Sequence, residues 1–377
     1  MRSLSSLLVL AAAIQLAACK PSGVIEDLGT LGGASFGYGI NAAGNVTGAS
    51  YLSGDSHGGG LHAFRYVDGL GMIDVGVLPP FNISEAHGIN SGGLIVGHSY
   101  VGDFVPHAFL ASATLNLTDL GTLGGEFSAA TDINDQGRIT GEAANAAEDR
   151  HAFVRTSAGM QDIGTLGGNR SVGLSINESG QVAGESRIGP GEATRAFRFT
   201  EGAGMINLGT LPGGTSSTGN GINNSGQVVG QSDYGLVANP SDTALIANPR
   251  QTGSVVNPKF RFKGFPPLFG PHAFLWTEGA GMRDLGHLGG TSEAMALNNN
   301  GIVVGWSMVA DGGFRAFRWT EAGGMIDLNT LLPRNSGWVL LVAWDVNDRG
   351  QITGEGLHNG VRRAFRYNPP ELVNQRR

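Results

Sequence analysis

The chain is poor in cysteine, in charged residues and in helical periodicity. Its 377 residues include one cysteine, Cys19, so no disulfide can form within a molecule. Charged residues account for 15% of the chain, with 31 acidic against 24 basic side chains and no basic patch. This balance argues against nucleic acid as a partner. No stretch has the apolar spacing of a persuasive helix. These absences favour an all-β protein that is stabilised without disulfides.

Catalytic signatures are also missing. The sequence has no Gly-x-Ser-x-Gly elbow, no phosphate-binding loop, no zinc motif and no obvious paired carboxylates. We therefore expect no cofactor, and a binding protein is favoured over an enzyme.

The chain is instead rich in repetition. Three phrases recur seven times: Asp-Leu-Gly, Ile-Asn-x-x-Gly, and an Ala-Phe segment that usually follows His or Arg. The Asp-Leu-Gly phrases are spaced by 47, 45, 43, 45, 77 and 43 residues. They begin at Asp27, Asp74, Asp119, Asp162, Asn207, Asp284 and Asp327. A period of this size indicates one structural unit per repeat. The 63 glycines fall at recurring turn positions within these units.

Each repeat predicts four short strands. In the fifth repeat, Asn223 and Gly226 link two apolar segments, because Asn bonds its own backbone and Gly accepts a positive φ. We number the strands so that the first carries Ile-Asn, the third Ala-Phe and the fourth Asp-Leu-Gly. Four antiparallel strands in about 45 residues, repeated seven times, favour a seven-bladed β-propeller. A β-solenoid is the alternative.

The two ends of the repeat array complement each other. Residues 24–29 form an Asp-Leu-Gly strand without a preceding repeat, and residues 363–367 form an Ala-Phe strand without a fourth strand after it. We expect residues 24–29 to complete the seventh blade and so hide the sheet edges. A solenoid would gain nothing from this pairing. The predicted propeller spans residues 24–377.

The first 19 residues resemble a lipoprotein signal. A short basic start precedes an apolar stretch at 4–13 that is too short to span a membrane, and Leu-Ala-Ala-Cys then ends at Cys19. The segment is similar to the lipobox of bacterial lipoproteins. That resemblance implies removal of residues 1–18, acylation of Cys19 and a short tether at 19–23. Lys20 implies, by analogy with lipoprotein sorting, an outer-membrane or cell-surface location on the periplasmic or extracellular side. An ordinary secretory signal is the alternative.

The repeats themselves resemble the HAF-type extracellular repeat of bacteria. The resemblance rests on His-Ala-Phe-Leu-Trp at 272–276, Gly-Met-Arg-Asp-Leu-Gly at 281–286 and the Ile-Asn turn at 222–230, and it covers nearly all of the chain from Asp27 to Tyr367. It implies an exported protein built from repeats and brings no catalytic residues with it. The chain departs from the pattern where Arg replaces the motif His, at Leu297-Asn298, and in the divergent seventh repeat.

The Ala-Phe motif predicts packing and surface roles. We expect one phenylalanine per repeat to pack between blades: Phe64, Phe109, Phe153, Phe197, Phe274, Phe317 and Phe365. The motif His alternates with Arg195, Arg315 and Arg363 in three repeats, and a metal ligand would not alternate with arginine. A metal held by His57 and His358, with Asp55 or Glu355, is a minor alternative, because the chain lacks an ordered ligand spacing.

The connections between the second and third strands vary most in length. The longest, at 233–271, contains six of the fifteen prolines and alternates basic with aromatic residues. Loops on a rigid scaffold commonly carry function, and flat aromatic faces can stack on sugars. The candidate binding residues are Tyr51, Tyr100, Tyr234, Trp306, Arg250, Lys259, Phe260 and Arg261. The alternative is that the aromatic residues pack against neighbouring loops and the insertion is merely tolerated.

The sequence therefore favours a lipid-anchored, non-enzymatic binding or scaffold module of the cell envelope. Its loop face is expected to recognise a glycan or a surface protein. A propeller hydrolase or lyase with a site near the central axis stays open, because such sites draw single residues from distant blades. Non-repeated Asp, Glu and His residues near the axis would favour the enzyme.

Overall fold

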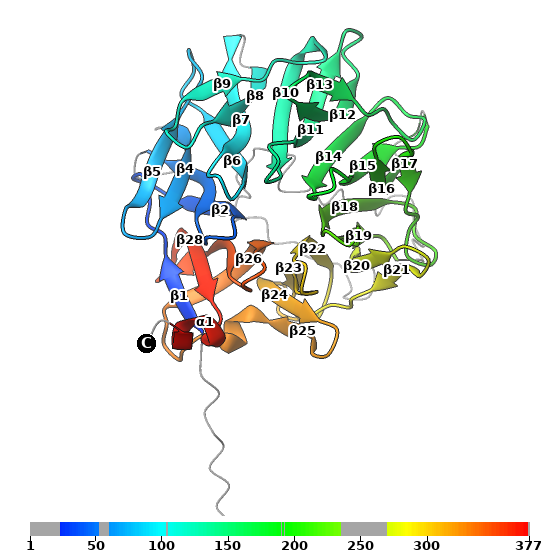
Figure 1. Cartoon of the computed structure of the whole chain (residues 1–377). Helices are drawn as coiled ribbons and strands as arrows, with labels where there is room; N and C mark the ends of the chain where they lie inside the picture. Colours follow the sequence, from blue (N-terminus) through cyan, green and yellow to red (C-terminus); the bar gives the residue numbers. More distant parts are fainter. Residues whose placement is uncertain are drawn as a thin grey trace, which may run out of the picture.

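The computed structural model describes residues 23–52, 60–102, 105–189, 191, 193–234 and 270–375. These residues form seven antiparallel sheets of four strands each, arranged in a ring (Figure 1). The first strands of successive blades contact one another and form the inner wall. The fold is a seven-bladed β-propeller, as the repeats predict, and the β-solenoid alternative is wrong. None of the helices in the described ranges is long and apolar enough to cross a membrane.

The strands of each blade follow one another from the axis outward. Blade one consists of β2 Ser35–Ile40, β3 Val46–Tyr51, β4 Leu61–Val67 and β5 Gly71–Gly76. Blade two consists of β6 Ser84–Ile89, β7 Ile95–Val101, β8 Val105–Ala111 and β9 Leu117–Asp119. Blade three consists of β10 Gly124–Ile133, β11 Ile139–Asn145, β12 Arg150–Thr156 and β13 Gly159–Asp162. Blade four consists of β14 Ser171–Ile176, β15 Val182–Arg187, β16 Thr194–Thr200 and β17 Gly204–Asn207. Blade five consists of β18 Ser217–Ile222, β19 Val228–Ser232, β20 His272–Thr277 and β21 Gly281–Asp284. Blade six consists of β22 Ser292–Leu297, β23 Val303–Met308, β24 Phe314–Thr320 and β25 Gly324–Asp327.

The seventh blade joins the two ends of the described chain. It consists of β26 Trp338–Val346, β27 Ile352–His358, β28 Val361–Asn368 and, outermost, β1 Val24–Asp27. Strand β1 pairs antiparallel with β28, Val24 opposite Asn368 and Asp27 opposite Phe365. The predicted closure by the N-terminal strand is therefore confirmed. A 3-10 helix, η2 Leu328–Leu331, precedes this blade and α1 Pro370–Gln375 follows it.

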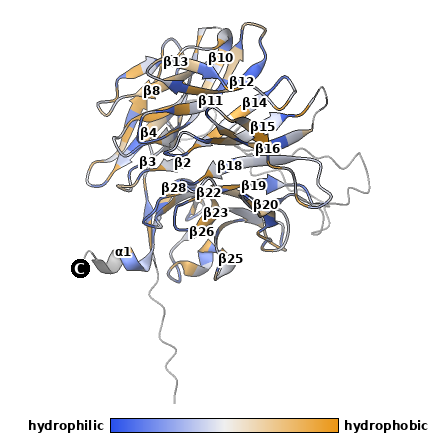
Figure 2. Cartoon of the chain, turned by 45° about the vertical axis from the view of Figure 1, so that its right-hand side comes forward, coloured by the Kyte–Doolittle hydropathy of each residue, from blue (hydrophilic) through white to orange (hydrophobic). Residues whose placement is uncertain are grey.

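The hydrophobic core is divided among the seven interfaces between blades. Figure 2 shows apolar residues along the strands throughout the ring. Each Ala-Phe phenylalanine is fully buried and packs against residues of the preceding blade. Phe153 of the third blade, for example, lies with Val96, Ala108 and Leu120 of the second. The packing role predicted for these phenylalanines is confirmed, and each contributes on the order of 1.5 to 3 kcal/mol by burial.

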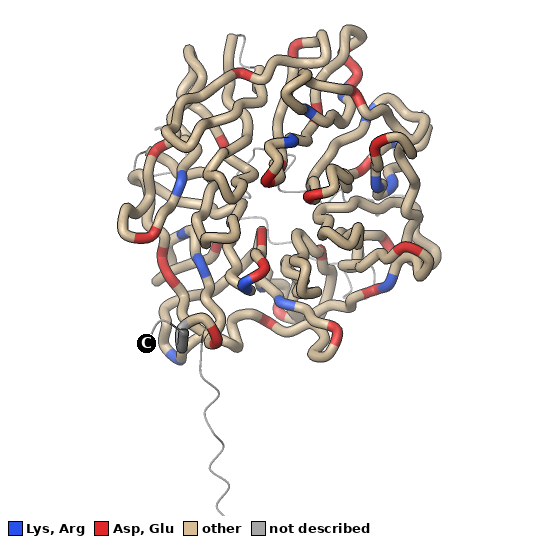
Figure 3. The backbone as a smooth tube through the Cα atoms, viewed as in Figure 1, with Lys and Arg blue, Asp and Glu red and all other residues tan. Residues whose placement is uncertain are grey.

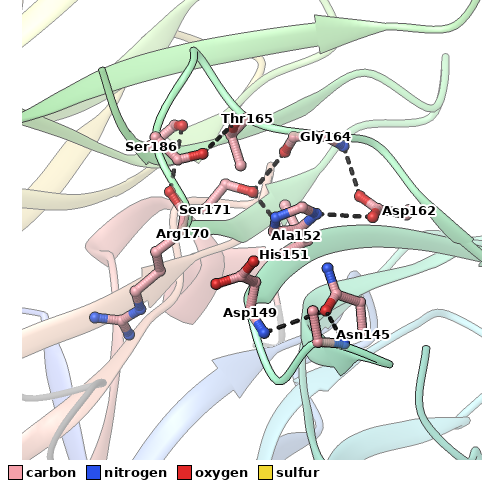
Figure 4. A network of polar contacts seen from close by, with 12 residues as sticks. Asn145, Asp149, His151, Ala152, Asp162, Gly164, Thr165, Arg170, Ser171 and Ser186 are labelled. Carbon is pink, nitrogen blue, oxygen red and sulfur yellow. Dashed lines mark hydrogen bonds and ion pairs between the residues drawn. The ribbon is translucent and has the colours of Figure 1, made fainter. Parts of the chain in front are cut away.

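A serine on the first strand latches each of six blades to the blade before it. Figure 4 shows the latch between blades three and four. Ser171 accepts a hydrogen bond from the Ala152 backbone N–H at 2.8 Å and donates one to the Gly164 carbonyl at 2.6 Å. The equivalent residues are Ser35, Ser84, Ser128, Ser217 and Ser292. In the seventh blade, Asn329 of η2 instead binds both backbone groups of Leu340.

The asparagines of the Ile-Asn motif form a closed ring of hydrogen bonds. Each is buried and donates from its side-chain nitrogen to the backbone carbonyl of the corresponding asparagine in the next blade, at 2.9 to 3.5 Å. The ring runs through Asn41, Asn90, Asn134, Asn177, Asn223, Asn298 and Asn347 and returns to Asn41. Each side-chain oxygen also accepts from backbone N–H groups of its own turn, as in Asn177 with Gln181. The motif thus shapes the turn and joins neighbouring blades.

We expect Asn177→Asp to lower the free energy of unfolding by about 2 kcal/mol at neutral pH. The aspartate keeps the bond to the Gln181 backbone. Its second oxygen replaces the donor that bonds the Asn223 carbonyl and the Gln181 side chain, both acceptors. The measurement is urea unfolding, and the matched control is Asn116→Asp, at an exposed residue outside the ring. Equal unfolding midpoints for the two variants would contradict a stabilising role for the ring.

Candidate functional site

Two positions near the axis vary between blades while the residues around them repeat. One follows the latch serine on the first strand, or Leu341 in the seventh blade, and the other follows the central glycine of the second strand. The two are paired in register as Phe36 with Ala49, Glu85 with His98, Ala129 with Glu142, Val172 with Glu185, Thr218 with Gln231, Glu293 with Trp306, and Val342 with Glu355. Both positions lie toward the face that carries the second-to-third connections. Figure 3 shows acidic residues along the inner rim of the ring.

Aromatic and imidazole rings from blades seven, one and two contact one another in series. The centroid separations are 5.5 Å from Trp344 to Tyr38, 5.5 Å from Tyr38 to His87, 5.3 Å from His87 to His98 and 5.8 Å from His98 to Tyr100. We call these five residues the aromatic arc. Its residues come from the inner two strands, so the rigid sheets fix their positions.

The arc extends at both ends and along its outer side. Trp306 and Met295 of the sixth blade pack in one cluster with Trp344. Phe36 stacks on Tyr38 at 6.3 Å and meets Tyr51 edge to face at 6.4 Å. The extended arc thus spans four adjacent blades. Blades three to five carry smaller or polar residues at the position of Tyr38, namely Thr131, Leu174 and Asn220.

Glu85 is the carboxyl group of the arc. It is 6% exposed, and no other described residue forms a hydrogen bond or ion pair with its side chain. Burial raises its pKa to about 7. Burial, and then the charge of Glu85, raise the pKa values of Tyr38, Tyr51 and Tyr100. The charge of Glu85 therefore acts on phenol groups from three strands.

His98 and His87 form an imidazole pair beside Glu85. His87 Nε2 and His98 Nδ1 are 3.2 Å apart, so one ring donates to the other. Burial lowers the pKa of His98 to about 4. At neutral pH His98 is uncharged and supplies no positive counter-charge to the neighbouring carboxylate.

The other four inner glutamates have protein partners. Glu142 pairs with Arg170 at 3.3 Å, and Glu355 with Arg362 at 3.1 Å. Glu293 accepts hydrogen bonds from Asn220 and from the Trp306 indole N–H. Thr218 donates to Glu185 at 2.8 Å. Among the described inner glutamates, Glu85 differs by lacking such a partner.

The structure brings some of the sequence-predicted binding residues to the arc. Tyr100 belongs to it, and Tyr51 lies against Phe36 at 8% exposure. Trp306 is buried at 3% exposure and bonded to Glu293. Tyr234 lies apart, at 46% exposure, stacked on His272 at 5.5 Å. Outside the described residues lie Cys19, His57, Arg250, Lys259, Phe260 and Arg261.

The histidines near the fourth strands form hydrogen bonds with aspartates. His358 Nδ1 lies 2.7 Å from the Asp27 carboxylate, and its ring stacks on Trp338 at 4.6 Å. The motif histidines pair with the aspartate of Asp-Leu-Gly in their own blades: His62 with Asp74, His107 with Asp119, His151 with Asp162 and His272 with Asp284. Within the described part of the chain, no group of three or more His, Cys, Asp or Glu residues is placed to hold a metal ion.

Comparison with known proteins supports the fold alone. No protein-family model matches the chain, and no curated protein matches its sequence. Among solved structures, the chain is similar to a puromycin hydrolase complexed with PGG, at 13% identity and a TM-score of 0.51, over 86% of this chain and 50% of that one. It is also similar to the extracellular domain of the putative one-component system BT4673 from B. thetaiotaomicron, at 9% identity and a TM-score of 0.50, over 91% of this chain and 39% of that one. The chain thus spans half or less of the length of these two proteins.

Sequence reasoning missed most of the arc. Tyr38, His87, His98 and Trp344 each occur once at their position in the repeat, so no motif marks them. An alignment of the seven repeats would have found them, because the position of Tyr38 varies from Tyr to His, Thr, Leu, Asn, Met and Trp directly after a Gly or Ala in every repeat. The signal in the sequence was a residue that varies at a fixed place in each repeat.

Proposed function

We propose that this protein is a lipid-anchored binding propeller of the cell envelope that recognises a glycan at the aromatic arc. The observation that carries the proposal is the series of ring contacts from Trp344 through Tyr38 to Tyr100 beside a buried carboxyl group. Aromatic faces stack on sugar rings, and the phenol, imidazole and carboxyl groups accept or donate hydrogen bonds to hydroxyls. Glu85, His98 and Tyr100 lie toward the face of the second-to-third connections, which vary most in length. Attachment through Cys19 rests on the resemblance of the N-terminal segment to a lipobox.

A second candidate function is that of a propeller enzyme acting at the same place. It is favoured by Glu85, whose pKa of about 7 suits a general acid or base, and by the adjacent imidazole pair. No nucleophile and base lie in a recognised arrangement among the described residues. We therefore favour binding without turnover.

We expect Tyr38→Ala to weaken glycan binding by roughly tenfold or more, because it removes the central ring of the arc. The measurement is binding of the purified protein to an array of glycans and envelope polymers, followed by titration of the strongest ligand. Tyr38 is partly exposed and contacts both Trp344 and His87. The matched control is Leu70→Ala, at a 71% exposed residue in a turn between β4 and β5.

The outcomes separate the candidate functions. Binding that Tyr38→Ala weakens and Leu70→Ala preserves would support recognition at the arc. Binding unaffected by Tyr38→Ala would contradict it. Conversion of the bound glycan to a new product during incubation, abolished by Glu85→Gln, would favour the enzyme.

A further inference from the structure

Among the described residues around the arc, one carboxyl group has no cationic side chain paired with it. Glu142 and Glu355 pair with Arg170 and Arg362. Arg362 also lies over the Phe36 ring, 5.7 Å from its centroid. No described Lys or Arg forms an ion pair with Glu85. A buried carboxylate without a partner is costly, and a bound cation would relieve that cost.

The groups around Glu85 suit an organic cation. His98 lies opposite Glu85 in the sheet, and its ring contacts that of Tyr100 at 5.8 Å. The charge of Glu85 raises the pKa values of Tyr38 of β2, Tyr51 of β3 and Tyr100 of β7. The faces of aromatic rings carry negative potential and attract ammonium groups, most strongly where water is excluded. His98 is the cross-strand partner of Glu85, and burial lowers its pKa, so it adds no competing positive charge. The site thus combines phenol faces, a neutral imidazole and Glu85. The Arg362–Glu355 ion pair also acts on Tyr38, and its two charges oppose each other there.

We propose that the arc binds an organic ammonium group, with Glu85 as its counter-ion and the tyrosine rings around it. This inference rests on the proposed glycan-binding function and narrows its ligand to an envelope polymer that carries an amino or quaternary ammonium substituent. The site would then select its ligand by positive charge as well as by shape.

The test compares two small probes of nearly equal shape. Choline carries a permanent positive charge, and 3,3-dimethylbutan-1-ol replaces its nitrogen with carbon and is neutral. Each is titrated into the purified protein while the heat of binding and the tryptophan fluorescence are recorded. We expect choline to bind at least roughly tenfold more tightly than the neutral probe. We expect Glu85→Gln to remove that preference, and Glu126→Gln, at an exposed residue of β10, to keep it.

Each result supports or overturns the inference. Equal affinity for the two probes, no binding of choline, or a preference that survives Glu85→Gln would overturn it. Circular dichroism checks that the variants are folded. The glycan array gives a separate readout: neutral glycans that bind in a Tyr38-dependent way, without choline binding, would leave the proposed function intact while this inference fails. An array without ligands would count against the proposed function alone.

Discussion

A chain that begins at Thr30 is expected to be less stable than one that begins at Gly23 by on the order of 5 kcal/mol. The deletion removes β1, and with it Leu28, which is 2% exposed and packs with Ile40 and Phe64 of the first blade. It also exposes the edge of β28. Because whole domains are stable by roughly 5–15 kcal/mol, a loss of this size threatens folding itself.

The largest single cost of this deletion falls on Arg366. Its side chain is 2% exposed, pairs with Glu26 and Asp68, and donates to the Gly44 carbonyl. Removal of Glu26 leaves a buried guanidinium with half of its counter-charge. Thermal and urea unfolding measure the loss, and a peptide of residues 23–30 added in trans should restore part of it. The control is a chain that ends at Asn368 and so lacks α1. If deletion of residues 23–29 lowers the free energy of unfolding no more than this control does, closure by β1 is contradicted.

The second expected result is that Glu85→Gln stabilises the protein, increasingly so as pH rises. The folded-state pKa of Glu85 is raised from 4.5 to about 7. Between these values the folded protein holds a proton that the unfolded chain releases, so wild-type stability falls as pH rises. The advantage of the variant should therefore grow by about 3 kcal/mol between roughly pH 4 and pH 8. Urea unfolding of both proteins across this range measures it.

His98 opposes this trend in the wild-type protein. Its pKa is lowered from 6.5 to about 4, so its contribution to stability rises with pH between these values. The two groups therefore offset each other over much of the same range, and the wild-type profile alone would hide both. The difference between wild type and Glu85→Gln isolates the carboxyl group. Glu126→Gln is the control, and an equal gain in that variant would refute the assignment to Glu85.

The fold could be predicted because its information is local and repeated. Turn residues, alternating apolar strands and the packing phenylalanines recur in every unit, and the unpaired segments at 24–29 and 363–367 specify the closure. The hydrogen bond that each Ile-Asn asparagine makes to the next blade could not be predicted from the sequence. It joins residues 43 to 75 positions apart, or 306 where the ring closes, so only the assembled structure shows it.

The candidate site could be predicted only in part, for a physical reason. Aromatic residues at the ends of second strands were visible as Tyr51, Tyr100 and Trp306, but their environment depends on the neighbouring blades. Trp306 is buried because Met295 and Trp344 cover it. Glu85 is unusual because no described residue forms a hydrogen bond or ion pair with its side chain, and a sequence does not display an absent contact.

The asparagine ring and the serine latch have a consequence for the origin of the fold. Each of blades one to five carries both halves of both contacts: the side chain that reaches one neighbour and the backbone groups that receive the other neighbour's side chain. A tandem copy of one unit can therefore pack against the original unit, head to tail, through the same contacts. Gene duplication can lengthen such an array one blade at a time, and the geometry of closure then selects the number retained. Divergence is free to concentrate at the two inner positions that the contacts leave unconstrained.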